Sequence, residues 1–86
     1  MIEFSHVIAD PQGLHARPVT DLAAEALRWP AGTRIDVACG DRVASARDLI
    51  GLMGLGACRG DELRFRIDGP DERGAAAGIQ ALVQGF

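Results

Sequence analysis

The residues best suited to chemistry lie in the stretch Gly13-Leu14-His15-Ala16-Arg17-Pro18. An imidazole titrates near about pH 6.5 in an unstructured chain, so a neutral ring nitrogen is available as a nucleophile at physiological pH. The guanidinium of Arg17 offers a planar fork of N–H donors that fits a phosphate group. These residue types at this spacing are compatible with a nucleophilic His15, and a phosphoryl group attached to it would lie beside Arg17.

Pro18 indicates how this site is positioned. Proline is tolerated in the first turn of a helix but not further in, so the helix is expected to begin at about His15 to Arg17. The first N–H groups of a helix lack partners, and the helix dipole favours an anion there by about 0.3–1 kcal/mol. Such a site can hold a phosphoryl group without trapping it. The alternative interpretation is an exposed histidine that only caps the helix.

The hydrophobic periodicity predicts the element order β-α-β-β-α-β-α. The expected strands cover residues 2–8, 33–39, 42–44 and 61–68, and the expected helices cover 16–28, 49–55 and the residues after 69–72. The first helix has apolar residues at helical spacing, namely Val19, Leu22, Ala23, Ala26 and Leu27. Ser45 precedes Asp48 by three residues and is expected to cap the second helix. The fold class is therefore α+β, with an antiparallel sheet that has helices on one face and a wet opposite face.

Length and composition bound the function. The chain has 86 residues, which predicts a single domain over 1–86 with no enclosed active site. Its net charge of −3 disfavours non-specific nucleic-acid binding, and no apolar run is long enough for a membrane span. Cys39 and Cys58 are expected to be free thiols, and neither has the spacing of a metal ligand. No secretory signal is apparent, which predicts a cytoplasmic protein. We expect no metal ion and no cofactor.

The motif Gly13–Pro18 resembles that of the HPr family, the phosphocarrier of the bacterial phosphoenolpyruvate-dependent phosphotransferase system. The segment Leu49-Ile50-Gly51-Leu52-Met53-Gly54-Leu55-Gly56 is similar to the second helix of that family, and the element order agrees as well. The resemblance covers nearly the whole chain. It implies an open-faced β-sandwich, a four-stranded antiparallel sheet with three helices on one face.

The same resemblance implies the function of individual residues. His15 would be phosphorylated on Nδ1 by enzyme I, which is charged from phosphoenolpyruvate, and would pass the group to an enzyme IIA domain. The backbone amides of Ala16 and Arg17 would contact the phosphoryl group. The chain would act as a monomer and would not be a stand-alone catalyst.

Partner docking is expected to involve an apolar surface near His15. By resemblance this surface comprises Thr20, Leu49, Ile50 and Met53. The alternative is that the second helix belongs wholly to the core, an interpretation that we favour only for Leu52 and Leu55. Methionine suits a surface that accepts several partners.

Two features depart from the family pattern. Asp48 occupies the position of the serine that some relatives phosphorylate in regulation, so it is either a permanent negative charge that affects partner choice or simply an acid at a helix start. The first helix lacks basic residues at Ala24 and Leu27, which weakens steering toward acidic partners. A nitrogen-type or other regulatory paralogue therefore remains the alternative to sugar uptake. A small-ligand or RNA-binding module fits poorly, because Trp29 is the only tryptophan and tyrosine is absent.

Overall fold

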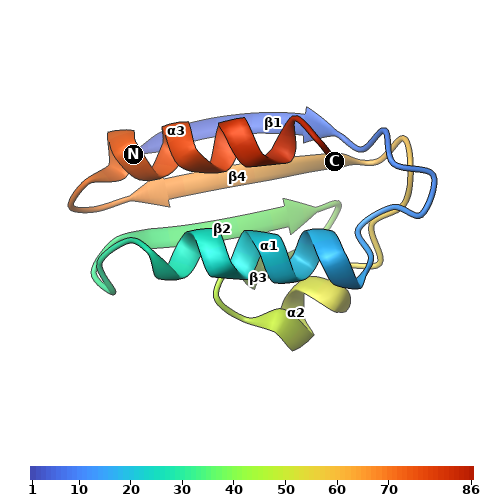
Figure 1. Ribbon diagram of the computed structural model, residues 1–86, viewed down its shortest axis with the longest axis horizontal. Coiled ribbons are helices and arrows are strands. Elements are labelled where there is room, and N and C mark those ends of the chain that lie inside the picture. Colours follow the sequence, from blue (N-terminus) through green and yellow to red (C-terminus); the bar gives the residue numbers. More distant parts are fainter.

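Four antiparallel strands form one sheet in the order β1-β4-β2-β3. The computed structural model describes residues 1–86 (Figure 1). The strands are β1 (Ile2–Val7), β2 (Arg34–Cys39), β3 (Arg42–Ser45) and β4 (Glu62–Asp68). The helices are α1 (Ala16–Leu27), α2 (Leu49–Met53) and α3 (Glu72–Val83). The order of elements along the chain is the one that the sequence predicts.

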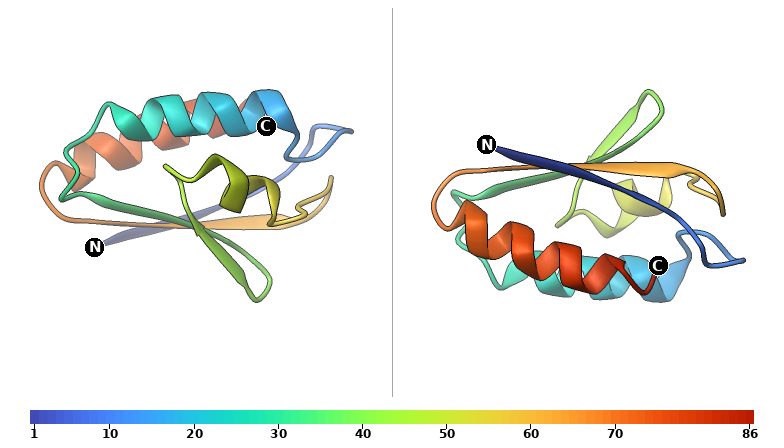
Figure 2. Two further views of the ribbon diagram at one scale, coloured as in Figure 1. Left: turned by 90° about the horizontal axis from the view of Figure 1, so that it is seen from below. Right: turned by 90° about the horizontal axis from the view of Figure 1, so that it is seen from above.

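All three helices lie on the same side of the sheet (Figure 2). Helix α1 packs against both α2 and α3, and α3 also contacts β1 and β4. The opposite face of the sheet has no covering layer. The structure therefore confirms the predicted α+β class and the open-faced arrangement of a four-stranded antiparallel sheet with three helices.

Strand β4 shows how the sequence pattern produces this arrangement. Leu63, Phe65 and Ile67 point toward the helices and are completely buried, whereas the residues between them are exposed. Because successive side chains of a strand alternate between faces, this one strand buries apolar area on one side and places charges on the other. Phe65 also stacks on Phe4 of the neighbouring strand, with ring centroids 4.9 Å apart.

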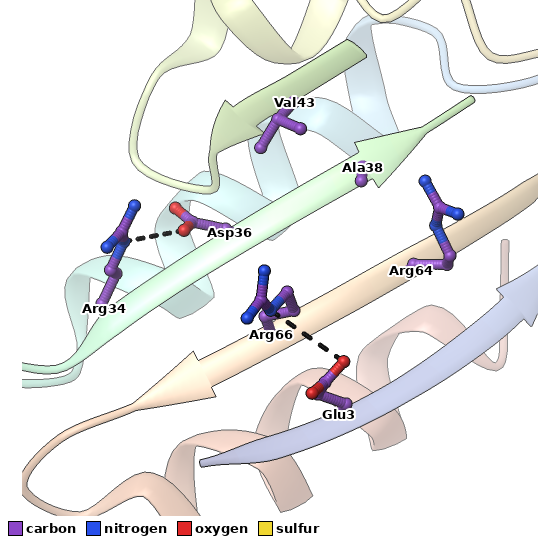
Figure 3. Close-up of a pocket in the computed structure, with 7 residues that line it drawn as sticks. All are labelled: Glu3, Arg34, Asp36, Ala38, Val43, Arg64 and Arg66. Atoms are coloured by element: carbon purple, nitrogen blue, oxygen red, sulfur yellow. Dashed lines mark ion pairs between the residues drawn. The ribbon is translucent and has the colours of Figure 1, made fainter. Parts of the chain in front are cut away.

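The open face of the sheet carries a shallow groove lined by charged side chains (Figure 3). Arg34 pairs with Asp36 at 2.8 Å, and Arg66 lies 3.9 Å from Glu3. Arg64 has no carboxylate partner and donates instead to the carbonyl oxygen of Gly40 at 2.7 Å. The charged residues that alternate along β2 and β4 thus keep this face hydrated. Arg34 and Asp36 pair along one strand, and Arg66 and Glu3 pair between neighbouring strands.

The start of α2 differs from the prediction. The expected cap at Ser45 is wrong, because Ser45 is the last residue of β3 and pairs with Asp36 in the sheet. Asp48 is the N-cap instead, and its Oδ1 accepts the backbone N–H of Gly51 at 3.0 Å. The Ser45 hydroxyl oxygen accepts the N–H of Arg47, which forms a local turn between the strand and the helix.

Two further expectations need correction. Leu27 was expected in the buried stripe of α1 but is 69% exposed. It follows the buried Ala26 by one residue, which places it about 100° further around the helix axis and at the edge of the stripe. The expected first helix over 16–28 is one residue too long, because α1 ends at Leu27 and Arg28 is its C-cap.

None of the three helices combines the length and the hydrophobicity that crossing a bilayer requires.

Candidate functional site

His15 is the N-cap of α1, as the position of Pro18 predicts. Its backbone is extended, with φ −91° and ψ −169°, and its carbonyl oxygen accepts the first bond of the helix from the N–H of Val19 at 3.2 Å. The N–H groups of Ala16 and Arg17 take part in no backbone hydrogen bond. Because no side chain caps this helix, two amide donors and the positive end of the dipole are free beside the imidazole.

Gly13 brings the loop before His15 close to the segment that follows α2. Its φ is +68°, a left-handed conformation that favours glycine. A Cβ atom at Gly13 would lie 2.6 Å from the carbonyl oxygen of Ala57 and 2.9 Å from the Cα of Cys58. The same carbonyl oxygen accepts the N–H of Leu14 at 3.0 Å. Backbone contacts therefore hold the loop that carries His15 against the segment between α2 and β4.

Asp10 contacts the imidazole directly, and the sequence analysis missed it. Its Oδ2 lies 3.2 Å from Nε2 of His15, and its Oδ1 accepts the backbone N–H of Gln12 at 2.8 Å. These contacts lower the pKa of Asp10, chiefly through the Gln12 N–H and then through the hydrogen bond with His15. The run Asp-Pro-Gln-Gly is a typical Asx turn, which is the sequence signal that could have identified this residue.

Arg17 is exposed and free to bind an anion. It lies in the first turn of α1, and none of the ion pairs in the structure involves it. Thr20, one turn further along α1, is exposed, and its hydroxyl donates to the carbonyl oxygen of Ala16 at 2.8 Å. The structure contains no group of three or more His, Cys, Asp or Glu side chains that could hold a metal ion.

Helix α2 exposes one apolar face and buries the other. Leu49, Ile50 and Met53 are 47%, 85% and 50% exposed, whereas Leu52 and Leu55 are 0% and 5% exposed. The buried pair is therefore part of the core, as expected. Ile50 is nearly fully exposed and Leu49 and Met53 are about half exposed, so much of their apolar area stays in water in the isolated chain. Helix α2 packs against α1, which carries the other predicted site residues. The structure thus places the two groups of predicted residues on neighbouring helices.

Comparison with known proteins agrees with this geometry. Residues 2–85 match the family model described as the PTS HPr component phosphorylation site. The phosphocarrier protein HPr of Mycoplasma genitalium is 37% identical over 84 residues, which cover 98% of this chain and 94% of that protein. A multiphosphoryl transfer protein of Xanthomonas campestris is 38% identical over 80 residues, which are 93% of this chain but only 9% of that longer protein.

Solved structures give the same result. The histidine-containing phosphocarrier protein of a Mycoplasma superposes with a TM-score of 0.89 at 28% identity, covering 94% of this chain and 90% of that one. HPr of Thermoanaerobacter tengcongensis also gives a TM-score of 0.89, at 27% identity, and covers 99% of this chain and 93% of its own. The chain therefore belongs to the HPr family, the phosphocarrier proteins of the phosphotransferase system.

Proposed function

We propose that His15 accepts a phosphoryl group from phosphorylated enzyme I, which is charged from phosphoenolpyruvate, and passes it to an enzyme IIA domain that serves sugar uptake. The observation that carries this proposal is the position of His15. Its side chain is 33% exposed at the N-terminus of α1, beside the unpaired amides of Ala16 and Arg17. A ring nitrogen that solvent can reach, next to free anion donors, is what a carrier requires.

The chemistry needs little from the chain beyond positioning and charge. A ring nitrogen of His15 forms a bond to phosphorus while the bond from phosphorus to the donor breaks, and that electron pair leaves with the donor. The phosphoryl oxygens then accept hydrogen bonds from the amides of Ala16 and Arg17 and from the Arg17 guanidinium. The dipole contributes about 0.3–1 kcal/mol, which is small enough that the group can be released to the next acceptor.

The docking surface consists of Thr20, Leu49, Ile50 and Met53, and both protein partners use it. Three of these four residues are large apolar side chains that the core does not need, as their exposure shows. Burying them against a partner would stabilise the complex by about 25 cal/mol for each Å² of apolar area removed from water. Two basic residues lie near this surface: Arg17 in the first turn of α1, and Arg42, whose guanidinium donates to the carbonyl oxygen of Gly54 at 2.9 Å. Charge steering by these two groups would add to the apolar contact.

The regulatory alternative is a nitrogen-type or similar paralogue that signals its phosphorylation state by binding other proteins. In the sequence, Asp48 is the residue that favours this alternative, because it places a permanent negative charge at the regulatory position. The carboxylate of Asp48 caps α2 through the N–H of Gly51, which accounts for the residue without a regulatory role. The sugar-uptake assignment is therefore preferred, and the alternative stays a prediction.

The test combines phosphorylation with docking variants. Phosphoenolpyruvate and enzyme I should label the parent chain and leave His15→Ala unlabelled; acid-labile label on the variant would contradict the proposal. Ile50→Ala should slow transfer, whereas Val43→Ala, which truncates a side chain 66% exposed on the open face of the sheet, should not. Equal rates for both variants would exclude α2 from docking.

A second assay separates the two branches and tests the assembly state. The phosphorylated chain is offered to a sugar-type and to a nitrogen-type IIA domain, and transfer only to the latter would favour the regulatory alternative. We propose that the chain works in the cytoplasm as a monomer of one domain. Size-exclusion chromatography with light scattering tests this, since an HPr from Thermoanaerobacter tengcongensis has been solved as a dimer.

A further inference from the structure

Asp10 takes part in four hydrogen bonds, one of which is its contact with His15. Its backbone N–H donates to the carbonyl oxygen of Phe86 at 3.0 Å, and its carbonyl oxygen accepts the N–H of Gly13 at 2.9 Å. Its two carboxylate oxygens divide their partners, with Oδ1 on the N–H of Gln12 and Oδ2 on Nε2 of His15. A side chain fixed at both its backbone and its carboxylate presents Oδ2 to the imidazole in a defined direction.

The contact decides which ring nitrogen carries the proton. An ionised carboxylate only accepts hydrogen bonds, so its partner Nε2 must be the donor. The neutral ring then has its proton on Nε2 and its lone pair on Nδ1. The pKa of Asp10 lies below its ordinary value of 3.8, so the carboxylate is ionised throughout the neutral pH range.

We propose that Asp10 is the positioning residue of the phosphoryl transfer, because it holds His15 in the tautomer whose Nδ1 is the nucleophile. This inference rests on the proposed function of His15. In the transfer the Nδ1 lone pair forms the bond to phosphorus, the bond to the donor breaks, and the electron pair of that bond leaves with the donor. The proton stays on Nε2, and the positive charge that develops on the ring lies against the carboxylate of Asp10.

The reverse step uses the same contact. When the phosphoryl group moves to the next acceptor, the electron pair of the N–P bond returns to Nδ1, and Nε2 keeps its proton. Asp10 therefore neither gains nor loses a proton during the cycle. It acts through His15 and does not touch the phosphoryl group, which bonds the opposite side of the ring.

Two substitutions at Asp10 distinguish control of the His15 tautomer from a purely structural role of the side chain. In Asp10→Asn the single carbonyl oxygen can keep the Gln12 N–H, which places the amide NH₂ where Oδ2 was. That group donates, so it would favour the tautomer with the lone pair on Nε2 and the proton on Nδ1. Asp10→Ala removes the contact without reversing it. Asp71→Asn is the control, since Asp71 makes no side-chain cap bond and its φ of +59° suits asparagine.

The experiment measures the ¹⁵N chemical shifts of the His15 ring in the unphosphorylated chain, at a pH at which the ring is neutral. We expect the parent and Asp71→Asn to carry the proton on Nε2 and Asp10→Asn to carry it mainly on Nδ1. Phosphorylation by enzyme I should slow by more in Asp10→Asn than in Asp10→Ala; the loss in Asp10→Asn should stay below the about 10⁴-fold that replacing a tautomer-fixing carboxylate by an amide costs in a buried catalytic triad, because Asp10 and His15 are partly exposed. Amide spectra establish that each variant is folded.

The outcomes are distinguishable. If neither substitution at Asp10 alters the ring shifts, Asp10 does not set the tautomer and the inference is wrong. If the shifts change but the rates do not, Asp10 has no part in the transfer, which also overturns it. If the parent chain takes up no label, the proposed function fails, and the ring shifts alone then decide whether Asp10 fixes the tautomer.

Discussion

Gly13→Ala should destabilise the chain far more than an ordinary glycine substitution. Alanine in a left-handed conformation costs about 1 kcal/mol or slightly more. At Gly13, where φ is +68°, the new Cβ would also lie 2.6 Å from the carbonyl oxygen of Ala57, a backbone atom that cannot rotate away. The segments must then separate, which weakens the bond from the Leu14 N–H to that oxygen and adds about 1–2 kcal/mol of lost bonding and strain.

The total is about 2–3 kcal/mol, and Gly40→Ala is the matched control. Gly40 has a φ of +60°, but no atom lies within 4 Å of the position of its Cβ. It should therefore cost only the conformational part, about 1 kcal/mol. For a domain of this size about 1 kcal/mol corresponds to about 4–8 °C in Tm, so the expected losses are about 8–24 °C for Gly13→Ala and about 4–8 °C for Gly40→Ala.

Thermal and urea unfolding followed by circular dichroism measure both variants under the same conditions. The fluorescence of Trp29, the only tryptophan, gives a second probe of the same transition. Equal losses for the two glycines would show that the close approach to Ala57 contributes nothing and would refute the reasoning. A larger loss at Gly13, accompanied by altered amide shifts at His15, would show that this contact holds the site loop.

Three further outcomes follow from named contacts. Asp48→Ala removes the cap of α2 and should lower the free energy of unfolding by about 0.5–2 kcal/mol in urea, whereas no change would mean that the cap is not formed in solution. The pKa of Glu72 is lowered, chiefly by the hydrogen bond from the amino-terminal ammonium group. The ionised Glu72 therefore stabilises the fold fully above pH 4.5, its ordinary pKa, and this stabilisation is lost as the pH falls through the lowered pKa. Glu72→Gln should be less stable than the parent at pH 7 and equally stable in strong acid. A loss of stability that persists in acid would argue against the pairing of Glu72 with the amino-terminal ammonium group. Burial raises the pKa of the Cys39 thiol, and the Asp61 carboxylate raises it further. Iodoacetamide at pH 8 should therefore alkylate Cys39 more slowly than the exposed Cys58, which mass spectrometry can follow. Faster reaction at Cys39 would contradict the structure.

The fold could be predicted from the sequence because its determinants are local. The alternation along β4 and the proline in the first turn of α1 act within a few residues, so they give the element and its buried face together. The exposed and buried residues of α2 could also be separated, since Ile50 and Leu52 point in different directions from one short helix. What the pattern could not decide was the cap of α2, because Ser45 and Asp48 both have suitable side chains. The sheet decides it, by using Ser45 as a strand residue opposite Asp36.

The site was only partly predictable for a related reason. His15 and Arg17 follow from a short motif, whereas the contact of Asp10 with the imidazole depends on how the loop closes. That closure is set by Ala57 and Phe86, which lie far along the chain and bond the backbone of the loop. A single sequence gives the residue types in such a loop but not the long-range contacts that turn one carboxylate toward the ring.

The hydrogen bonds from Ala9 and Asp10 to Phe86 also bear on how the protein is made. The loop that carries His15 is synthesised well before residue 86, yet the carbonyl oxygen of Phe86 accepts two of the hydrogen bonds that hold this loop. Strand β1, which leads into the loop, likewise pairs with β4, the last strand of the chain, and not with β2 or β3. During translation the histidine is therefore present long before its surroundings are complete. The backbone bonds that hold Ala9 and Asp10 beside His15 can therefore form only after residue 86 has been synthesised.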